Sequence, residues 1–392
     1  MTRLIDIVNF NADASCFDSQ KWLSCLSGGV DSVFCNWLSL YIRHSKKIVL
    51  GLTGATISDL VTHNPESVEL IRKHPDIFQM ILRPYSHDIS LLRNFDGFCF
   101  NLAAGISVLK AIFGLESPYY LPAEFMMTNE QISILAGHGI RSTFVNASRY
   151  DNELASRIPE HCYTVKGILG SSLGCIPVQG VLTQSYLRCI QLWDSRKWNE
   201  TVSSGNHDLY LWRDGESSFL LPRGIERENF WLNNCSAQRV HLGQEEYAEH
   251  IQSNLFQSYP VHSFSAWMKE FRMMGYIGRI MDTEKILRRL PPVAKYLWLL
   301  AINSDILSSV EKRSPIIQLK LSSADEQTQK YRILRSERGW EGEEFLALLD
   351  QCVIDGKMPM EFTTPRLAHH IKARGRIDHL ASLEPIWKNA MP

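Results

Sequence analysis

Apolar residues in the first 150 positions fall into two alternating kinds of segment. Short aliphatic runs are typical of buried strands, and longer stretches with apolar residues every three or four positions are typical of helices. Alternation of the two indicates a parallel sheet or barrel. The pattern predicts strands at residues 4–10, 47–53, 77–82, 119–121 and 142–146, and helices at 33–45, 65–74, 96–113 and from 128 onward.

Two of the predicted helices carry recognisable end signals. Gly114 follows the apolar stretch that ends at Phe113, and a glycine at this place is a common C-terminal cap. Thr128 has Gln131 three residues later, the spacing of a capping box at a helix start. Both signals support the helix boundaries drawn from the apolar pattern.

Polar side chains follow the predicted strands. Asp13, His87, Glu124 and Arg149 each come shortly after a strand, and Asn11 opens the polar tract after the first one. In parallel α/β folds such residues gather at one face, where the chemistry usually lies. A carboxylate such as Glu124, close to an apolar strand and Pro122, is expensive to bury without a partner, which favours a functional role.

The pattern changes twice in the remainder of the chain. Between about 160 and 240 it loosens into Gly-, Ser- and Trp-containing segments, which predict long loops and hairpins around a site. Beyond Ser263 it becomes largely helical. We therefore expect a β/α barrel catalytic domain at 1–262 and a helical C-terminal region at 263–392 packed on the barrel, in line with the length of the chain.

Composition narrows the functional class. The 392 residues include 41 Lys+Arg and 42 Asp+Glu, so no basic excess indicates a nucleic-acid partner. No uninterrupted apolar run approaches membrane-spanning length, and the N-terminus shows no cleavable leader, so we expect no membrane partner. The nine cysteines are scattered without a CxxC pair, which predicts buried thiols in a reducing cytoplasm. The oligomeric state is not indicated.

The block from Ile81 to Asn146 resembles the catalytic domain of glycoside hydrolase family 57 and the related polysaccharide deacetylases. The resemblance rests on Pro84-Tyr85-Ser86-His87, on Phe113-Gly114, on Tyr120-Leu121-Pro122-Ala123-Glu124 and on Gly137-His138-Gly139. It implies an irregular parallel (β/α)7-type barrel and an enzyme that cleaves or transfers at a glycosidic bond, with Glu124 as nucleophile. A retaining enzyme of this kind needs a second carboxyl group as acid.

The resemblance is weaker on both sides of this block. Val8-Asn9-Phe10-Asn11 is similar to the family's first strand, but Ala12-Asp13-Ala14 replaces its usual His-Gln-Pro motif. The segment from Val240 to His250 is similar to the approach to the last barrel strand, where Gly243 replaces the catalytic aspartate. The resemblance therefore implies that the acid is either absent or supplied by Glu245 or Glu246.

The remaining site residues are candidates for contacts with a carbohydrate partner. We expect no cofactor, and we expect no metal because too few ligands are visible. Aromatic rings pack well on the C–H faces of sugars, and polar groups bind their hydroxyls. The predicted substrate-binding residues are Asn11, Asp13, Tyr85, His87, Arg149, Trp212 and Trp231.

Other functions stay open at this point. Leu26-Ser27-Gly28-Gly29-Val30-Asp31-Ser32 resembles the SGGxDS loop of ATP pyrophosphatases, which would imply an ATP-dependent ligase or amidotransferase-like enzyme. A glycine-rich turn before a helix exposes N–H groups to a pyrophosphate. The same residues also suit a plain helix start capped by Asp31 or Ser32. A non-catalytic sugar-binding protein, or a metal-dependent deacetylase using Asp13 and His87, are further alternatives.

Overall fold

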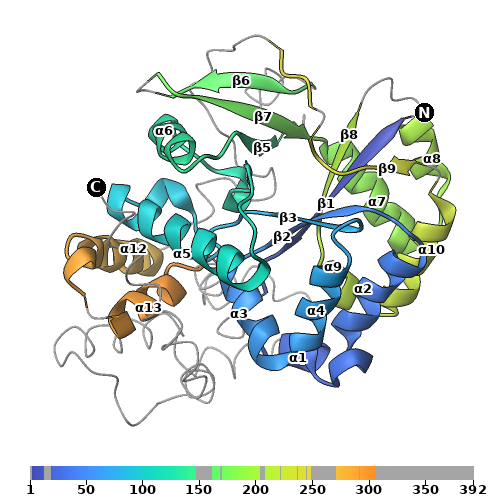
Figure 1. Ribbon diagram of the computed structural model, residues 1–392, viewed down its shortest axis with the longest axis horizontal. Helices are drawn as coiled ribbons and strands as arrows, with labels where there is room; N and C mark the ends of the chain where they lie inside the picture. Colours follow the sequence, from blue (N-terminus) through green and yellow to red (C-terminus); the bar gives the residue numbers. More distant parts are fainter. Residues whose placement is uncertain are drawn as a thin grey trace.

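The computed structural model describes residues 2–12, 19–146, 161–167, 170–203, 208–220, 222–235, 237–243, 245–248, 271–290 and 292–304. Strands and helices alternate through most of this part of the chain (Figure 1). The strands are β1 (Arg3–Phe10), β2 (Ile48–Leu52), β3 (Phe78–Ile81), β4 (Tyr119–Tyr120), β5 (Ser142–Asn146), β6 (Tyr163–Lys166), β7 (Ser172–Val178), β8 (Leu209–Asp214) and β9 (Gln238–Arg239).

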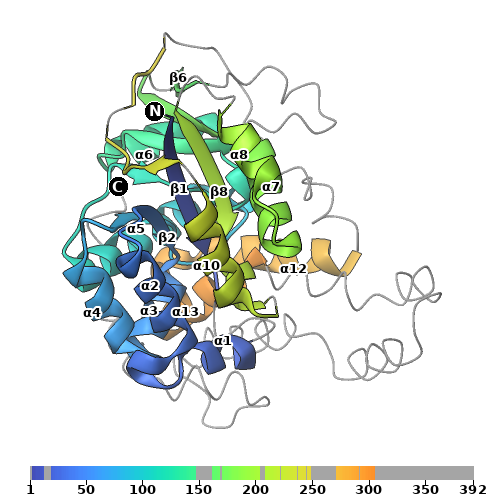
Figure 2. The ribbon, with the colours of Figure 1, turned by 90° about the vertical axis from the view of Figure 1, so that its right-hand side faces the viewer.

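The helices that connect and cover these strands run over the outside of the sheets (Figure 2). They are α1 (Ser19–Leu26), α2 (Val33–Arg43), α3 (Gly54–His63), α4 (Pro65–Lys73), α5 (Phe95–Phe113), α6 (Asn129–Gly137), α7 (Gly180–Leu192), α8 (Arg196–Ser203), α9 (Ser217–Leu220) and α10 (Gly224–Asn234), followed by α12 (Phe271–Glu284) and α13 (Pro292–Ala301).

In the described part of the chain, seven parallel strands follow one another around an irregular barrel. One sheet has the order β3-β2-β1-β8, and the other has the order β4-β5-β7, with β6 added antiparallel to β7. The first junction between the sheets is a bridge in which the Leu121 N–H donates to the carbonyl of Leu82 at 2.9 Å. At the second, the Gln179 N–H donates to the carbonyl of Tyr210 at 3.0 Å. The expected (β/α)7-type architecture is confirmed.

Alternation along the strands separates two hydrophobic cores. In β1, Ile5 and Ile7 belong to a small cluster within the barrel, whereas Leu4, Val8 and Phe10 belong to a larger cluster under the helices. Neighbouring side chains on a strand point to opposite faces, so each strand supplies both cores. Members of the inner cluster from the other strands include Val49, Ile81, Leu121, Phe144, Ile176 and Tyr210.

A buried charged network fixes the outer face of β8. Arg213 is 1% exposed, and its guanidinium donates to both carboxylate oxygens of Asp6 at 2.7 and 3.2 Å. It also lies 2.9 Å from Glu228 Oε1 of α10 and stacks 4.8 Å from the ring centre of Trp231. A buried arginine is tolerated because its charge is paired on several sides. Trp231 is therefore a core residue that packs against Arg213.

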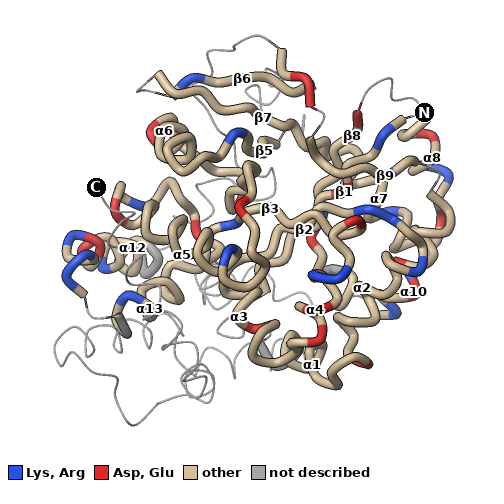
Figure 3. Tube along the Cα trace, in the orientation of Figure 1, with Lys and Arg blue, Asp and Glu red and all other residues tan. Residues whose placement is uncertain are grey.

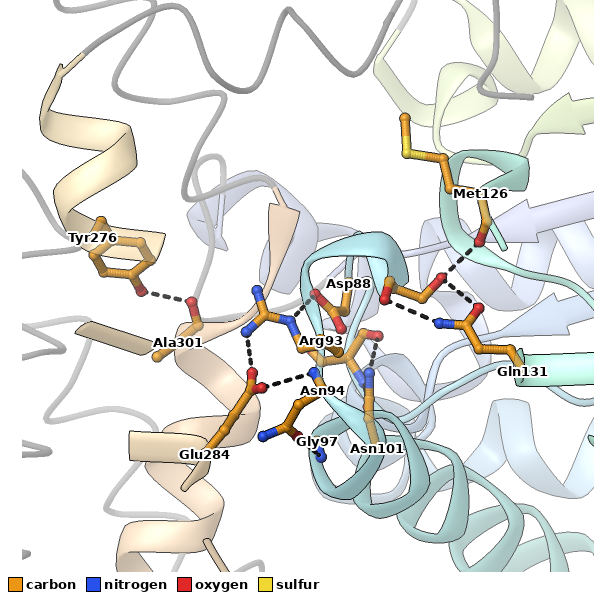
Figure 4. A network of polar contacts seen from close by, with 12 residues as sticks. Asp88, Arg93, Asn94, Gly97, Asn101, Met126, Gln131, Tyr276, Glu284 and Ala301 are labelled. Carbon is orange, nitrogen blue, oxygen red and sulfur yellow. Dashed lines mark hydrogen bonds and ion pairs between the residues drawn. The ribbon is translucent and has the colours of Figure 1, made fainter. Parts of the chain in front are cut away.

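The helices after the barrel lie against α5 and the loop after β3 (Figure 4). Arg93 donates to Asp88 at 3.1 Å and to Glu284 of α12, and Glu284 accepts from the backbone N–H of Asn94 at 3.0 Å. Asp88 forms a bridge with Asn303, just beyond α13. The proposed boundary between 262 and 263 lies outside the described residues, so the division into two regions stays a prediction.

The predicted strands and helices of the first 150 residues are present with small shifts in their ends. Gly114 has φ 68°, and Thr128 and Gln131 form the expected capping box. The prediction missed α1 and α3. Between 160 and 240 the antiparallel pair β6–β7 agrees with the expected hairpins, but the expected long loops were wrong for most of the region. That region contributes β7, β8 and four helices. Strand β8 was not predicted because Arg213 and Asp214 give it a polar end that does not look like a buried strand.

Helix α5 is long and apolar enough to cross a membrane by length and composition. Its most apolar window has a mean hydropathy of 1.4, and 67% of that window is buried inside the protein. Gly105 of α5 lies so close to the segment after β3 that an added Cβ would be 2.3 Å from the carbonyl oxygen of Arg83. These contacts are those of a barrel helix. Basic and acidic residues are interspersed along the described chain (Figure 3).

Candidate active site

A cavity of about 380 Å³ opens where the C-terminal ends of β1, β3, β4 and β8 converge. This is the end of a parallel barrel at which active sites form, because the loops after the strands meet there. The residues that line it are Asn9, Asn11, Arg83, His87, Leu121, Pro122, Glu124, Phe125, Thr183, Leu187, Trp212, Arg213 and Asp214.

Glu124 reaches the cavity from a strained turn. The turn Ala123–Phe125 follows β4, and both Glu124 (φ 52°) and Phe125 (φ 55°) adopt left-handed backbone conformations. Non-glycine residues rarely occupy this region, and strain of this kind concentrates at functional sites. The Glu124 side chain is 16% exposed, so it is largely desolvated but open to a ligand.

His87 connects Glu124 to two other segments. Its Nδ1 lies 3.1 Å from Asn11 Nδ2 and 3.1 Å from Ser304 Oγ, and its Nε2 lies 3.7 Å from Glu124 Oε1. The Asn11 amide is oriented by Asn9, whose Nδ2 donates to Asn11 Oδ1 at 3.4 Å. Because Asn11 Nδ2 can only donate, Nδ1 of His87 accepts, and the ring proton sits on Nε2, which faces Glu124.

Asp214 is the second carboxylate of the cavity. It ends β8, pairs in register with Asn9 of β1, and lines the same cavity as Glu124. Burial raises its pKa to about 6, although the Glu216 N–H at 3.3 Å and the charge of Arg83 act in the opposite direction. A carboxyl group with this pKa can hold a proton in weakly acidic solution and release it near neutrality.

Sequence reasoning missed Asp214 although a signal was present. The run from Leu209 to Asp214 ends in an acid and is followed by Gly215, which is the same arrangement of strand and polar end that singled out Glu124. The apolar alternation was obscured by Arg213, whose charge is neutralised by Asp6 on the outer face. Polar residues at strand ends therefore do gather at the cavity, and Asp214 was missed only because its strand was not recognised.

Glu245 and Glu246 do not belong to the cavity, so their prediction as the acid was wrong. Glu245 accepts a hydrogen bond of 2.9 Å from the hydroxyl of Tyr119, the first residue of β4. Glu246 is exposed on the same segment. That end of the barrel is opposite to Glu124. The error arose because β9 covers only Gln238–Arg239 and pairs with the start of β1, so this segment is not the last barrel strand.

Three aromatic residues were predicted to stack on a sugar, and the structure brings one of them to the cavity. Trp212 lines it and makes an edge contact with Phe125 at 5.4 Å between ring centres. Tyr85 is 1% exposed and packs so tightly on Gly54 that an added Cβ would lie 2.5 Å from its ring. Trp231 is fully buried under Arg213. The stacking role was wrong for the latter two, which are core residues.

Of the other predicted substrate-binding residues, some line the cavity and some lie outside the described residues. Asn11 and His87 line the cavity. Asp13 and Arg149 lie outside the described residues. Across the described part of the chain, no group of three or more His, Cys, Asp or Glu side chains could hold a metal ion. The deacetylase alternative therefore finds no ligand set among these residues.

The glycine-rich loop from Ser27 to Ser32 caps helices. It follows helix α1, not the strand that an ATP pyrophosphatase loop requires. Ser32 Oγ accepts from the Cys35 N–H at 3.1 Å, so Ser32, and not Asp31, caps α2. Asn64, the cap of α4, donates to Ser32 Oγ at 2.6 Å and to the carbonyl of Leu26 at 2.7 Å. The loop thus joins two helix starts.

Several solved protein structures share this architecture, although the sequence itself matches no model of a known protein family and no curated protein. A glycoside hydrolase family 57-type branching enzyme from Pyrococcus horikoshii superposes with a TM-score of 0.62 at 11% identity, covering 100% of this chain and 97% of the enzyme. The family 57 branching enzyme from Thermococcus kodakaraensis gives 0.59 at 11% identity, covering 97% and 94%.

The 4-alpha-glucanotransferase from Thermococcus litoralis gives a TM-score of 0.61 at 12% identity over 78% of this chain. The chain spans only 56% of the length of that glucanotransferase. Identities this low show a shared fold without showing a shared reaction. The chain has the irregular (β/α)7 barrel fold of these glycoside hydrolase family 57 structures.

Proposed function

We propose that the protein is a carbohydrate-active enzyme that cleaves or transfers at a glycosidic bond, with Glu124 as nucleophile and Asp214 as acid and base. The observation that carries this proposal is the pair of carboxyl groups from β4 and β8 on one cavity, one of them with a raised pKa. Glycosidases use two carboxyl groups in different protonation states in this way. The structures that share this fold include a 4-alpha-glucanotransferase and a glycoside hydrolase family 57-type branching enzyme, which agrees with the proposal.

In the proposed first step, a Glu124 oxygen attacks the anomeric carbon while Asp214 donates its proton to the glycosidic oxygen. The bond between the anomeric carbon and that oxygen breaks, and a glycosyl ester forms on Glu124. Asp214 then takes a proton from water or from a sugar hydroxyl, which attacks the anomeric carbon and releases Glu124. Water yields hydrolysis, and a sugar acceptor yields transfer.

The neighbours of Glu124 suit the role of nucleophile. The Nε2 of His87 lies 3.7 Å from Glu124 Oε1 and faces the carboxylate that attacks in the proposed step. Trp212 offers a ring to the apolar face of a sugar. The cavity is partly enclosed by Leu121, Pro122 and Leu187, which limit competing water.

A panel of aryl glycosides, followed by release of the aryl alcohol, tests the proposal. Glu124→Gln should abolish turnover, and Asp214→Asn should lower it by about 10²- to 10⁴-fold, the usual contribution of general acid catalysis. Glu245→Gln is the matched control, because this glutamate lies at the opposite end of the barrel and should keep full turnover.

Added azide separates the two roles. It should restore turnover to Glu124→Ala as a substitute nucleophile and give a glycosyl azide of inverted configuration, whereas with Asp214→Ala the azide product should have retained configuration. Full activity of folded Glu124→Gln would refute the proposal. Ligand binding without turnover on any glycoside would instead favour a sugar-binding protein.

A further inference from the structure

Arg83 forms part of the cavity floor. It follows β3 by two residues and lines the cavity with Glu124 and Asp214. Gly51 on the neighbouring strand β2 leaves the space for its side chain, since an added Cβ there would lie 3.2 Å from Arg83 Cδ and 3.0 Å from Leu121 Cδ2. A glycine on β2 thus makes room for a cation inside the barrel.

The guanidinium of Arg83 is buried with unpaired donors. Arg83 is 2% exposed, and in the described part of the chain neither its Nε nor its Nη1 has a hydrogen-bond partner. Arg213, which is buried to the same degree, donates to both oxygens of Asp6. An unpaired buried charge is costly, so donors left open at a cavity wall favour a ligand that completes them.

The surrounding charges leave Arg83 incompletely neutralised. Burial lowers its pKa to about 10, and this outweighs the opposite influence of Tyr120, Glu124, Glu216 and Asp214. Arg83 is therefore still charged at neutral pH. Asp214 holds a proton in weakly acidic solution, which leaves fewer negative charges at the cavity in the state ready for the first step.

We infer that the sugar bound in this cavity carries an anionic substituent, a carboxylate or a phosphate ester, which Arg83 recognises through its unpaired N–H groups. The inference rests on the proposed function and specifies its substrate class. The planar guanidinium matches the two oxygens of a carboxylate or phosphate better than it matches a single hydroxyl. The carboxylate of Glu124 repels an anion elsewhere in the cavity, so the charged group is directed to Arg83.

Calorimetric titration of the full chain with matched sugars tests this inference. The pairs are glucose with glucuronate and galactose with galacturonate, and glucose 6-phosphate is compared with glucose and with inorganic phosphate. At least one acidic sugar should bind about 10- to 100-fold more tightly than its neutral parent, as expected for one charged pair. The uronate and phosphate arms separate the two sources of charge.

Variants assign that preference to Arg83. Arg83→Met should reduce the preference for the acidic sugar to near unity, and Arg83→Lys should retain part of it. Gly51→Ala, which displaces the Arg83 side chain without removing it, should weaken the preference and supplies a second variant if Arg83→Met does not fold. Arg188→Gln removes an exposed arginine of α7 and should change nothing. Circular dichroism checks folding.

The outcomes separate this inference from the proposed function. Equal binding of acidic and neutral sugars, or a preference that persists in Arg83→Met, overturns the role of Arg83 while the glycosidase proposal stands. Inorganic phosphate bound as tightly as glucose 6-phosphate also overturns it, because the sugar is then not recognised. Absence of binding by every sugar together with absence of turnover overturns both.

Discussion

Replacing Asp214 by asparagine should stabilise the protein at neutral pH while removing its proposed acid. Burial raises the pKa of Asp214 from its ordinary value of 3.8 to about 6. Each pKa unit corresponds to about 1.4 kcal/mol, so ionisation of this group destabilises the folded state by about 3 kcal/mol at high pH. The hydrogen bond from the Glu216 N–H to Oδ1 can be kept by the asparagine carbonyl.

The pH dependence of this effect has a defined sign. The folded pKa lies above the unfolded one, so the folded state binds the proton more tightly and its stability falls as the pH rises from about 4 to about 6. Above this window the full effect is present. Urea denaturation should thus show the advantage of Asp214→Asn growing by about 2 kcal/mol between pH 4.5 and pH 8.

The control is Asp76→Asn, which removes an exposed carboxylate before β3 and changes the net charge equally. An advantage of Asp214→Asn that stays constant or shrinks as the pH rises would refute the reasoning. That result would mean that Asp214 is ionised without penalty in the folded protein, and it would remove the main electrostatic argument for its role as an acid.

Three further substitutions test other parts of the structure. Arg213→Met should lower the free energy of unfolding by about 3–5 kcal/mol, because it removes the shortest ion pairs of the buried carboxylates of Asp6 and Glu228; a loss below about 1 kcal/mol in urea denaturation would contradict this. Gly114→Ala should cost about 1 kcal/mol, because alanine is strained at φ 68°, whereas Gly137→Ala, without positive φ or close neighbours, should cost less in the same assay. Ser304→Ala should lower turnover about fivefold, since one hydrogen bond to His87 contributes roughly 1 kcal/mol, and Ser304→Thr, which keeps the hydroxyl, should restore it.

The first half of the fold could be predicted from the sequence because its strands are mostly apolar and its helices carry clear end signals. Gly114 and Thr128 illustrate local chemistry that acts as expected. In β8, by contrast, Arg213 is compatible with burial only because Asp6 and Glu228 lie across from it, more than 200 residues earlier and 15 residues later. A short window of sequence does not contain these partners.

Only part of the candidate site could be predicted, because only some of its residues follow strands that the sequence pattern identifies. Glu124 and His87 follow strands that the pattern identifies, so the convergence of strand ends brings them together. Asp214 was missed with its strand, and Ser304 approaches His87 from beyond the barrel by tertiary packing. The predictions of a cytoplasmic location and of no nucleic-acid or membrane partner stay predictions.

The side chains of neighbouring residues on β8 point to opposite faces of the barrel sheet. Asp214 faces the cavity, and Arg213 faces the buried network with Asp6. A slip of β8 by one residue would reverse every side chain, placing the guanidinium in the cavity and an unpaired carboxylate beside Asp6. Such a misaligned barrel would confront Asp6 with a like charge in a buried setting. We therefore expect the Asp6–Arg213 pair to favour the observed register of β8 over the shifted one, and its loss should produce misregistered, inactive molecules as well as less stable ones.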